Sequence, residues 1–177
     1  MARIDDVNFY LQPADKLAVE LLGKAIVRNI DGEIHRYLIA ETECYMGVED
    51  TACHACKGKT PRASTLWERG GKLYVYLIYG IYNLMNIIAG NEGEPMGVLI
   101  RGVKDINGPG RVARKLGIGK DFNKEDLLIS ERIWLEETNL KPEYITTPRI
   151  GIDYARKEDR ERLWRFVAYD SLKDIDI

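Results

Sequence analysis

The feature that most constrains the fold of this chain is an Asp-Gly dipeptide at residues 31–32, which joins two apolar segments rich in β-branched residues. Asp-Gly suits the tight turns of β-hairpins, because both residues tolerate a positive φ. Residues 25–45 are therefore predicted to form two antiparallel strands. A second hairpin is predicted within residues 70–90, where a strand runs to about Ile78 and the chain bends at residues 79–80. Hairpins of this kind favour an antiparallel sheet.

The rest of the chain predicts a mixture of helices and strands. Pro13 and Gly23 bracket an amphipathic helix, because proline suits the first turn and glycine the end of a helix. No internal repeat, low-complexity tract or linker interrupts the sequence, so residues 1–177 are expected to form one α+β domain. Further strands are predicted at residues 94–103, 149–155 and 163–170, a short basic helix within 107–118, and one or two helices within 124–137.

Composition and charge distribution limit the possible functions. No apolar run approaches the ~20 residues of a membrane-spanning helix, and the first residues lack a secretory pattern, so an untargeted cytoplasmic protein is expected. The net charge is −2, which argues mildly against an obligate nucleic-acid binder. Residues 57–72, however, carry five basic side chains against one acidic, and residues 101–120 carry six against one. Such segments are either solvated faces or a nucleic-acid surface.

The three cysteines, Cys44, Cys53 and Cys56, leave two interpretations open. An odd number of cysteines in a chain of this length favours a reducing compartment over a disulfide framework. Cys53 and Cys56 have C-x-x-C spacing, but a structural zinc site needs a second pair of ligands, and His35 lies in a different segment. Partly buried thiols are the favoured interpretation, and a zinc site is the alternative.

Two carboxylates are candidates for chemistry in the second strand of the first hairpin. Because strand residues alternate between faces, Glu41, Glu43 and Tyr45 should share one side, and Thr42 and Cys44 the other. Glu43 could act as a general base on water, or it could be a solvated carboxylate; the pattern does not decide between them. Glu41 is expected to be solvated at the end of the strand.

Two basic residues could support such chemistry. His54 could carry protons, bind a ligand or donate a hydrogen bond to a bound base, although a lone histidine is more often structural. Arg101 follows an apolar strand, so its guanidinium either pairs with a carboxylate or anchors a catalytic group or a water molecule.

The segment 73–86 contains four tyrosines, which fall into two groups. Tyr74 and Tyr76 share one face of a strand, and Tyr74 is expected to pack in a core. Tyr79 and Tyr82 flank Gly80 at the expected hairpin tip, where a core role does not fit. Exposed aromatic side chains between two basic segments are suited to stacking on or inserting between nucleic-acid bases.

Several motifs, in order, resemble the alkyladenine (3-methyladenine) DNA glycosylase family. The resemblance runs from residues 9–24 to the closing segment RIGIDYA…LWRF and so covers essentially the whole chain. It implies a curved antiparallel sheet with a protruding β-hairpin, surrounded by helices. The motifs are ETECYMGVEDTACH (41–54), TPR (60–62), LYVYLIYGIYNLMNI (73–87), VLIRG (98–102) and NGPGRVARKLGI (107–118).

The resemblance implies a monomeric base-excision repair enzyme that flips damaged purines out of double-stranded DNA and hydrolyses their N-glycosidic bond. Implied substrates are 3-methyladenine and, as further candidates, 7-methylguanine, hypoxanthine and ethenoadenine. The resemblance implies no lyase activity, no metal and no cofactor. It is consistent with a compact, nucleoid-associated prokaryotic form.

The resemblance also implies roles for individual residues. Glu43 would activate the attacking water, and Arg101 would hold that water or the carboxylate. Tyr79 would fill the gap left by the flipped nucleotide. The base pocket would comprise Tyr45, His54 and Tyr76, with Asn86 at its rim rejecting unsuitable exocyclic groups; the other DNA-contacting residues would be Ile81, Tyr82 and Arg62.

Two other functions compete with this interpretation. A non-catalytic damage sensor could use the same scaffold, but it would gain nothing from a carboxylate facing phosphate-rich DNA. A sugar-cleaving glycosidase could use Glu41 and Glu43 as its carboxylate pair, but the basic segments would then have no purpose.

Overall fold

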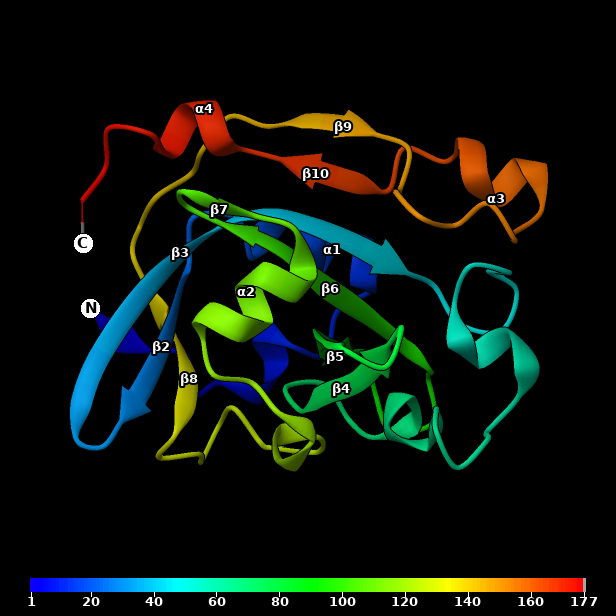
Figure 1. Ribbon diagram of the computed structural model, residues 1–177, viewed down its shortest axis with the longest axis horizontal. Helices are drawn as coiled ribbons and strands as arrows, with labels where there is room; N and C mark the ends of the chain where they lie inside the picture. Colours follow the sequence, from blue (N-terminus) through cyan, green and yellow to red (C-terminus); the bar gives the residue numbers. More distant parts are fainter. Residues whose placement is uncertain (177) are drawn as a thin grey trace.

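The computed structural model describes residues 1–176, which adopt an α+β fold (Figure 1). Within these residues, ten strands form one open sheet in which all pairings are antiparallel, and four short α-helices lie around it. The main strand order is β1-β8-β2-β3-β6-β5-β4; β10 pairs with β3 and β9, and β7 pairs with β6. The fold class expected from the sequence is confirmed.

The first elements up to the central strands are β1 (Ala2–Arg3), α1 (Ala14–Glu20), β2 (Ala25–Ile30), β3 (Glu33–Tyr45), β4 (Leu73–Ile78), β5 (Tyr82–Ala89) and β6 (Met96–Val103). The remaining elements are β7 (Ile106–Asn107), α2 (Pro109–Lys115), β8 (Ile133–Glu137), β9 (Ile145–Thr147), α3 (Lys157–Glu161), β10 (Arg165–Val167) and α4 (Tyr169–Leu172).

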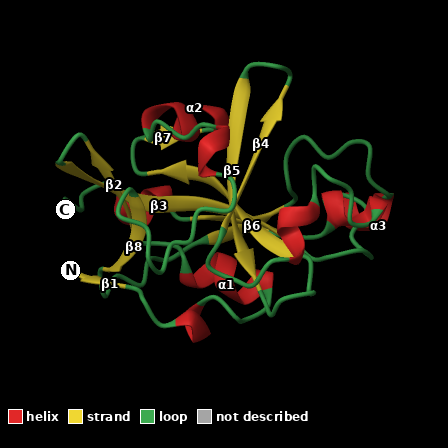
Figure 2. Cartoon of the chain, turned by 90° about the horizontal axis from the view of Figure 1, so that it is seen from below, coloured by secondary structure: helices red, strands yellow, loops and turns green. Residues whose placement is uncertain are grey.

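Both predicted hairpins are confirmed. Asp31 and Gly32 connect β2 to β3 with φ values of 52° and 91°. The β4–β5 hairpin turns at Tyr79 and Gly80, with φ values of 52° and 70°, and projects from the body of the molecule (Figure 2). Glycine adopts such angles freely, whereas a tyrosine there costs about 1–2 kcal/mol.

The long strand β3 organises the sheet. Its first half pairs with β2, and its second half lies between β6 and β10. The alternation predicted for its side chains is confirmed: Thr42 faces α1 and donates a hydrogen bond to the Ala18 carbonyl, while Glu41 and Glu43 face the opposite side. The apolar core lies on the α1 side, where Leu17 of α1 is fully buried. The opposite face of β3, which carries Glu41 and Glu43, is therefore the one on which a polar site can form.

Two predicted elements were wrong, and a third was right only in part. Residues 124–137 contain no α-helix; their last part is β8, which pairs with β2. Residues 149–155 are not a strand but a succession of turns, with Gly151 at a φ of 75°. Predicted strand 163–170 is β10 followed by α4. None of the helices among the described residues has the length and apolar character that crossing a bilayer requires.

Candidate active site

The register of five neighbouring strands places one residue from each in a single row across the sheet. Residues opposite one another in paired strands project from the same face. We call this set the cross-strand row; it runs from β4 of the β4–β5 hairpin to β10. In order, it consists of Tyr74 on β4, Asn86 on β5, Leu99 on β6, Glu43 on β3 and Arg165 on β10.

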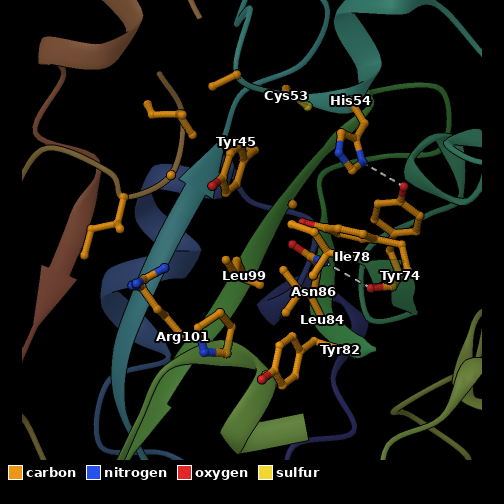
Figure 3. Close-up of a pocket in the computed structure, with 18 of the residues that line it drawn as sticks. Tyr45, Cys53, His54, Tyr74, Ile78, Tyr82, Leu84, Asn86, Leu99 and Arg101 are labelled. Carbon is orange, nitrogen blue, oxygen red and sulfur yellow. Dashed lines mark hydrogen bonds between the residues drawn. The ribbon is translucent and has the colours of Figure 1, made fainter. Parts of the chain in front are cut away.

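A cavity of about 660 Å³ lies over part of this row, where Tyr74, Asn86 and Leu99 line it. Tyr45 projects from β3 on one side, and His54 and Tyr74 lie on the other (Figure 3). The short 3-10 helix His54–Lys57, the first turn of α2 and the segment 150–154 complete its walls. Its volume is typical of sites that enclose a small organic group.

Glu43 is fully buried, at 0% exposure, and lies behind the cavity wall. Its Oε2 accepts a hydrogen bond from the Tyr45 hydroxyl at 2.9 Å, and its Oε1 accepts one from the Ile150 N–H at 2.8 Å. Burial raises the pKa of this carboxyl, although nearby Arg101 and the two hydrogen bonds lower it in part. A carboxylate with a raised pKa beside a cavity is a stronger proton acceptor than an ordinary solvated carboxylate.

Arg101 stands between two buried carboxylates. Its Nε lies 2.9 Å from Oε1 of Glu41 and 3.6 Å from Oε1 of Glu43, and its side chain lines the cavity. The expectation that Glu41 is solvated is wrong, since its exposure is 2%. Arg165 and Tyr169 cover it from the C-terminal part of the chain, each donating a hydrogen bond to its carboxylate. Local sequence gives no sign of those distant partners.

Aromatic rings form the wall opposite β3. The centroids of Tyr74 and Tyr76 are 5.2 Å apart, and the His54 ring lies 4.6 Å from that of Tyr76. Tyr74 is buried as expected, but its hydroxyl also hydrogen-bonds Nδ1 of His54 at 2.9 Å. Burial, reinforced by the positive charges of Arg62 and Lys57, lowers the pKa of His54 to about 4. The imidazole is therefore neutral at physiological pH.

Asn86 lies deeper than the expected rim position, with 6% of its surface exposed. Its Nδ2 donates a hydrogen bond to the Tyr74 carbonyl at 3.2 Å. Because a carbonyl only accepts, this contact fixes the amide orientation and leaves Oδ1 as the remaining acceptor. Asn86 lines the cavity, so Oδ1 and the second N–H of Nδ2 are the polar groups that it can offer to an occupant.

The hairpin tip lies at the mouth of the cavity. Tyr79 is 83% exposed and Ile81 69% exposed. Tyr82 is less free than expected, because its ring packs against α2 at Gly110; a Cβ at that glycine would lie 2.9 Å from the Tyr82 Cδ1. Tyr79 and Ile81 are thus the most exposed apolar side chains of the tip, while Tyr82 helps form the cavity wall.

The two basic segments meet at this cavity. Lys57 and Arg62 come from the first segment, Arg101 and Arg111 from the second, and all four line it. Arg62 donates to the Leu77 carbonyl at 3.1 Å, and its Cζ lies 5.4 Å from the centre of the Tyr76 ring. The convergence of both segments on one opening indicates a surface for a polyanion.

The segment 149–154 is a part of the site that sequence reasoning missed. Arg149 forms two hydrogen bonds with Asp50, at 2.6 and 2.9 Å, and its Cζ lies 4.8 Å from the centre of the Tyr45 ring. This anchor places the Ile150 N–H on Glu43 and brings Tyr154 to the cavity. Pro148 and Gly151 were the available signal, since both residue types argue against a central strand.

The cysteines are all free thiols; Cys44 and Cys53 are buried, and Cys56 is partly exposed. Cys53 and Cys56 line the cavity. Burial raises the pKa of Cys53 to about 11. Within residues 1–176, no group of three or more His, Cys, Asp or Glu side chains is arranged to hold a metal ion.

Known proteins resemble this chain over nearly its whole length. A relative from Wolbachia pipientis of Culex pipiens is 44% identical, and the match covers 90% of this chain and 86% of the relative. One from Borreliella burgdorferi strain B31 is 39% identical, with coverage of 94% and 96%. A third, from Sodalis glossinidius, is 42% identical, with coverage of 90% and 93%. Each is named, provisionally, a 3-methyladenine DNA glycosylase.

The sequence pattern of one family matches most of the chain, over residues 8–106 and 104–172. That family is described as methylpurine-DNA glycosylase. Its match agrees with the relatives named above and confirms the resemblance drawn from the motifs. The chain therefore belongs to the methylpurine-DNA glycosylase family and is a DNA glycosylase, a hydrolase of N-glycosyl bonds.

Proposed function

We propose that this glycosylase removes 3-methyladenine and related damaged purines from double-stranded DNA by flipping the base into the cavity. A single domain acts as a monomer, and its nucleophile is water. The observation that carries the proposal is the buried carboxylate of Glu43, which adjoins a cavity lined with aromatic rings. An enzyme that acts on a base must take it out of the stack, and such a cavity can receive it.

Glu43 is the proposed general base. Each carboxylate oxygen has two lone pairs, and each accepts one hydrogen bond from the described residues. A water molecule can therefore bind to a remaining lone pair, or it can displace the Tyr45 hydroxyl. Arg101 lines the cavity beside this carboxylate and helps to hold the water. General-base catalysis of this kind contributes roughly 10²–10⁴-fold in rate.

Tyr45, Tyr76 and His54 are the proposed base-binding residues. An N3- or N7-alkylated purine carries a positive charge, which is attracted to the electron-rich faces of tyrosine rings. The pKa of His54, lowered to about 4 chiefly by burial, keeps the imidazole neutral, so it does not repel a cationic base. The positive charge also makes such a base a good leaving group, so Glu43 need only deprotonate the water.

Asn86 is the proposed substrate filter. Its fixed amide presents Oδ1 as an acceptor next to the base. Purines that place a lone pair or a bulky exocyclic group against this oxygen are disfavoured, because a buried polar group without a partner costs about 1–3 kcal/mol. The same contact contributes to discrimination among 7-methylguanine, hypoxanthine and ethenoadenine.

Tyr79 and Ile81 are proposed to occupy the gap in the stack, with Tyr82 and Arg62 contacting DNA beside them. Flipping costs a few kcal/mol, and an aromatic side chain in the vacated position offsets part of that cost. The high exposure of Tyr79 and Ile81 and the basic residues around the opening support this assignment.

The test is base release from duplex DNA that carries one 3-methyladenine or 7-methylguanine, measured in single turnover. Wild-type protein should release free base and leave alkali-labile abasic sites. Glu43→Gln should slow release by roughly 10²–10⁴-fold, because the amide cannot accept the proton, yet should keep its affinity for damaged duplex. The matched control is Glu33→Gln, on the same strand but with an exposed side chain; its rate should equal that of wild type.

Several outcomes would contradict the proposal. Base release by Glu43→Gln at the wild-type rate would remove Glu43 as the base. Tight binding to damaged DNA without any release by wild type would indicate a sensor. Borohydride trapping of a covalent protein–DNA adduct, lost in Lys57→Ala, would show that an amine at the cavity attacks the sugar and that water does not.

A further inference from the structure

Glu41 and Glu43 belong to one buried group of charged side chains. The proposed chemistry gives Glu43 a role but gives Glu41 none. Glu41 shares the cavity-side face of β3 with Glu43 and has an exposure of only 2%. Its Oε1 lies 2.5 Å from Nε of Arg165 and 2.9 Å from Nε of Arg101, and its Oε2 accepts a hydrogen bond from Tyr169 at 2.9 Å. Burying a carboxylate is costly unless it is paired. The three partners of Glu41 compensate for that cost.

An irregularity in the sheet brings Glu41 and Arg101 together. Glu41 lies opposite Gly102 and Thr42 lies opposite Ile100, so Arg101 has no residue directly across from it on β3. Bulges of this kind re-aim a side chain, often beside an active site. Here the Arg101 guanidinium reaches both carboxylates of β3.

Gly102 is a second element of the same arrangement. A Cβ at this position would lie 1.7 Å from the Tyr169 hydroxyl and 3.0 Å from the Glu41 Cβ. Only glycine therefore leaves room for the phenol to reach Glu41.

Arg101 is oriented by charge rather than by a directed hydrogen bond. Its Nε is buried and makes no well-aligned hydrogen bond with any of the described residues, although it lies within ion-pair distance of both carboxylates. The shorter distance is to Glu41. The position of this guanidinium consequently depends on the negative charge of Glu41 at least as much as on that of Glu43.

We propose that Glu41 is a positioning residue for the glycosylase reaction: its charge holds Arg101 beside Glu43, divides the attraction of that guanidinium, and so keeps Glu43 a strong base. The inference rests on the proposed function of Glu43. Without the Glu41 charge, the attraction of Arg101 would act on Glu43 alone and would stabilise its deprotonated form. A more stable carboxylate is a weaker proton acceptor.

The charged and titratable groups around Glu43 come from every element packed against it. Two of them, Arg149 and Tyr45, make one stack, since the guanidinium lies over the ring. The set consists of Glu41 and Tyr45 on β3, Tyr76 on β4, Arg101 on β6, Arg165 on β10, Tyr169 on α4 and Arg149 in the segment after β9.

The experiment is a single-turnover pH–rate profile of base release for wild type, Glu43→Gln and Glu41→Gln, with folding checked by circular dichroism. In wild type the rate is lost as pH falls through the pKa of Glu43, which burial raises. Glu41→Gln should move this acid limb to lower pH, because a neighbouring negative charge is gone. It should also lower the plateau rate roughly tenfold, because the base is weaker and Arg101 less well held.

Tyr169→Phe is the matched control. It removes a hydrogen bond from the same carboxylate but keeps the Glu41 charge, so its acid limb should stay in the wild-type position. A Glu41→Gln protein that is less stable but has an unmoved acid limb would overturn the inference, because Glu41 would then be only structural. If Glu41→Gln does not fold, Glu41→Asp serves instead: it withdraws the charge from Arg101 by one methylene and should slow release several-fold, and a wild-type rate would overturn the inference.

Failure of this inference and failure of the proposed function give different results. An active wild type with an inactive Glu43→Gln supports the proposed function, whatever Glu41→Gln does. An inactive Glu41→Gln with an active Glu43→Gln would assign the base to Glu41 and overturn both.

Discussion

Behind the cavity wall lies a set of buried, paired charges, whereas at the tip of the β4–β5 hairpin apolar side chains are exposed to solvent. Glu43, Asp50 and Arg149 are all buried and hydrogen-bonded. Tyr79 and Ile81 are more than two-thirds exposed, and Tyr79 adopts a positive φ. Backbone strain of this kind is found most often at functional sites. On the roles proposed above, chemistry and DNA contact belong to different parts of the molecule, so substitutions should affect them independently.

The largest effect on stability is expected at the buried ion pair of Arg149 and Asp50. Arg149→Met leaves the buried carboxylate of Asp50 without its bidentate partner, and breaking a buried pair in this way costs about 3–5 kcal/mol of unfolding free energy. Urea unfolding measures the loss. The double variant Arg149→Met/Asp50→Asn should recover part of it, because no uncompensated charge remains. A change below about 0.5 kcal/mol, the range of ordinary surface substitutions, would show that this buried pair stabilises the fold no more than an exposed side chain at the tip does.

A smaller effect, on a different property, is expected at the tip. Tyr79→Ala should weaken binding to damaged duplex by about 1–3 kcal/mol, the contribution of one stacked aromatic side chain. Hydrolysis of an already flipped base should change less. The unfolding free energy should stay within about 0.5 kcal/mol of wild type, because the side chain is exposed. Tyr79→Phe, which retains the ring, is the control. Equal affinities for Tyr79→Ala and wild type would contradict the proposal that Tyr79 occupies the gap in the base stack.

The smallest expected effect concerns pH at the aromatic wall between these regions. Burial lowers the pKa of His54 from an ordinary value near 6.5 to about 4. The unfolded chain therefore binds more protons between these values, so the contribution of His54 to stability is complete above pH 6.5 and is lost as pH falls towards 4. His54→Gln should flatten the dependence of the melting temperature on pH in this window. His35→Gln, at a partly exposed position on β3, should retain it; identical slopes for the two variants would contradict the assignment.

The parts of the fold that sequence could predict are those set by neighbouring residues. Asp31-Gly32 and Tyr79-Gly80 specify their turns through backbone conformation alone, and both predicted hairpins are present in the structure. Residues 133–137 form a strand instead of a helix, because pairing with β2 overrides a local preference. Arg149 belongs to a loop held by Asp50, a partner about a hundred residues away in sequence.

The candidate site shows the same limit. Family motifs pointed to Glu43, Tyr45 and Asn86, and the roles given to them stay predictions. Sequence reasoning placed Glu41 in solvent and missed Ile150, because their partners come from distant parts of the chain. Alternation along a strand shows which residues share a face, but not what covers that face.

The sequence by itself determined an antiparallel α+β fold, two hairpins, two basic segments and membership of a DNA glycosylase family. Only the tertiary structure decided that Tyr74, Asn86, Leu99, Glu43 and Arg165 form one row across five strands, and that a cavity lies over part of that row. The reason is physical. Turns depend on a few adjacent dihedral angles, whereas the burial and basicity of a carboxylate depend on every chain segment packed around it.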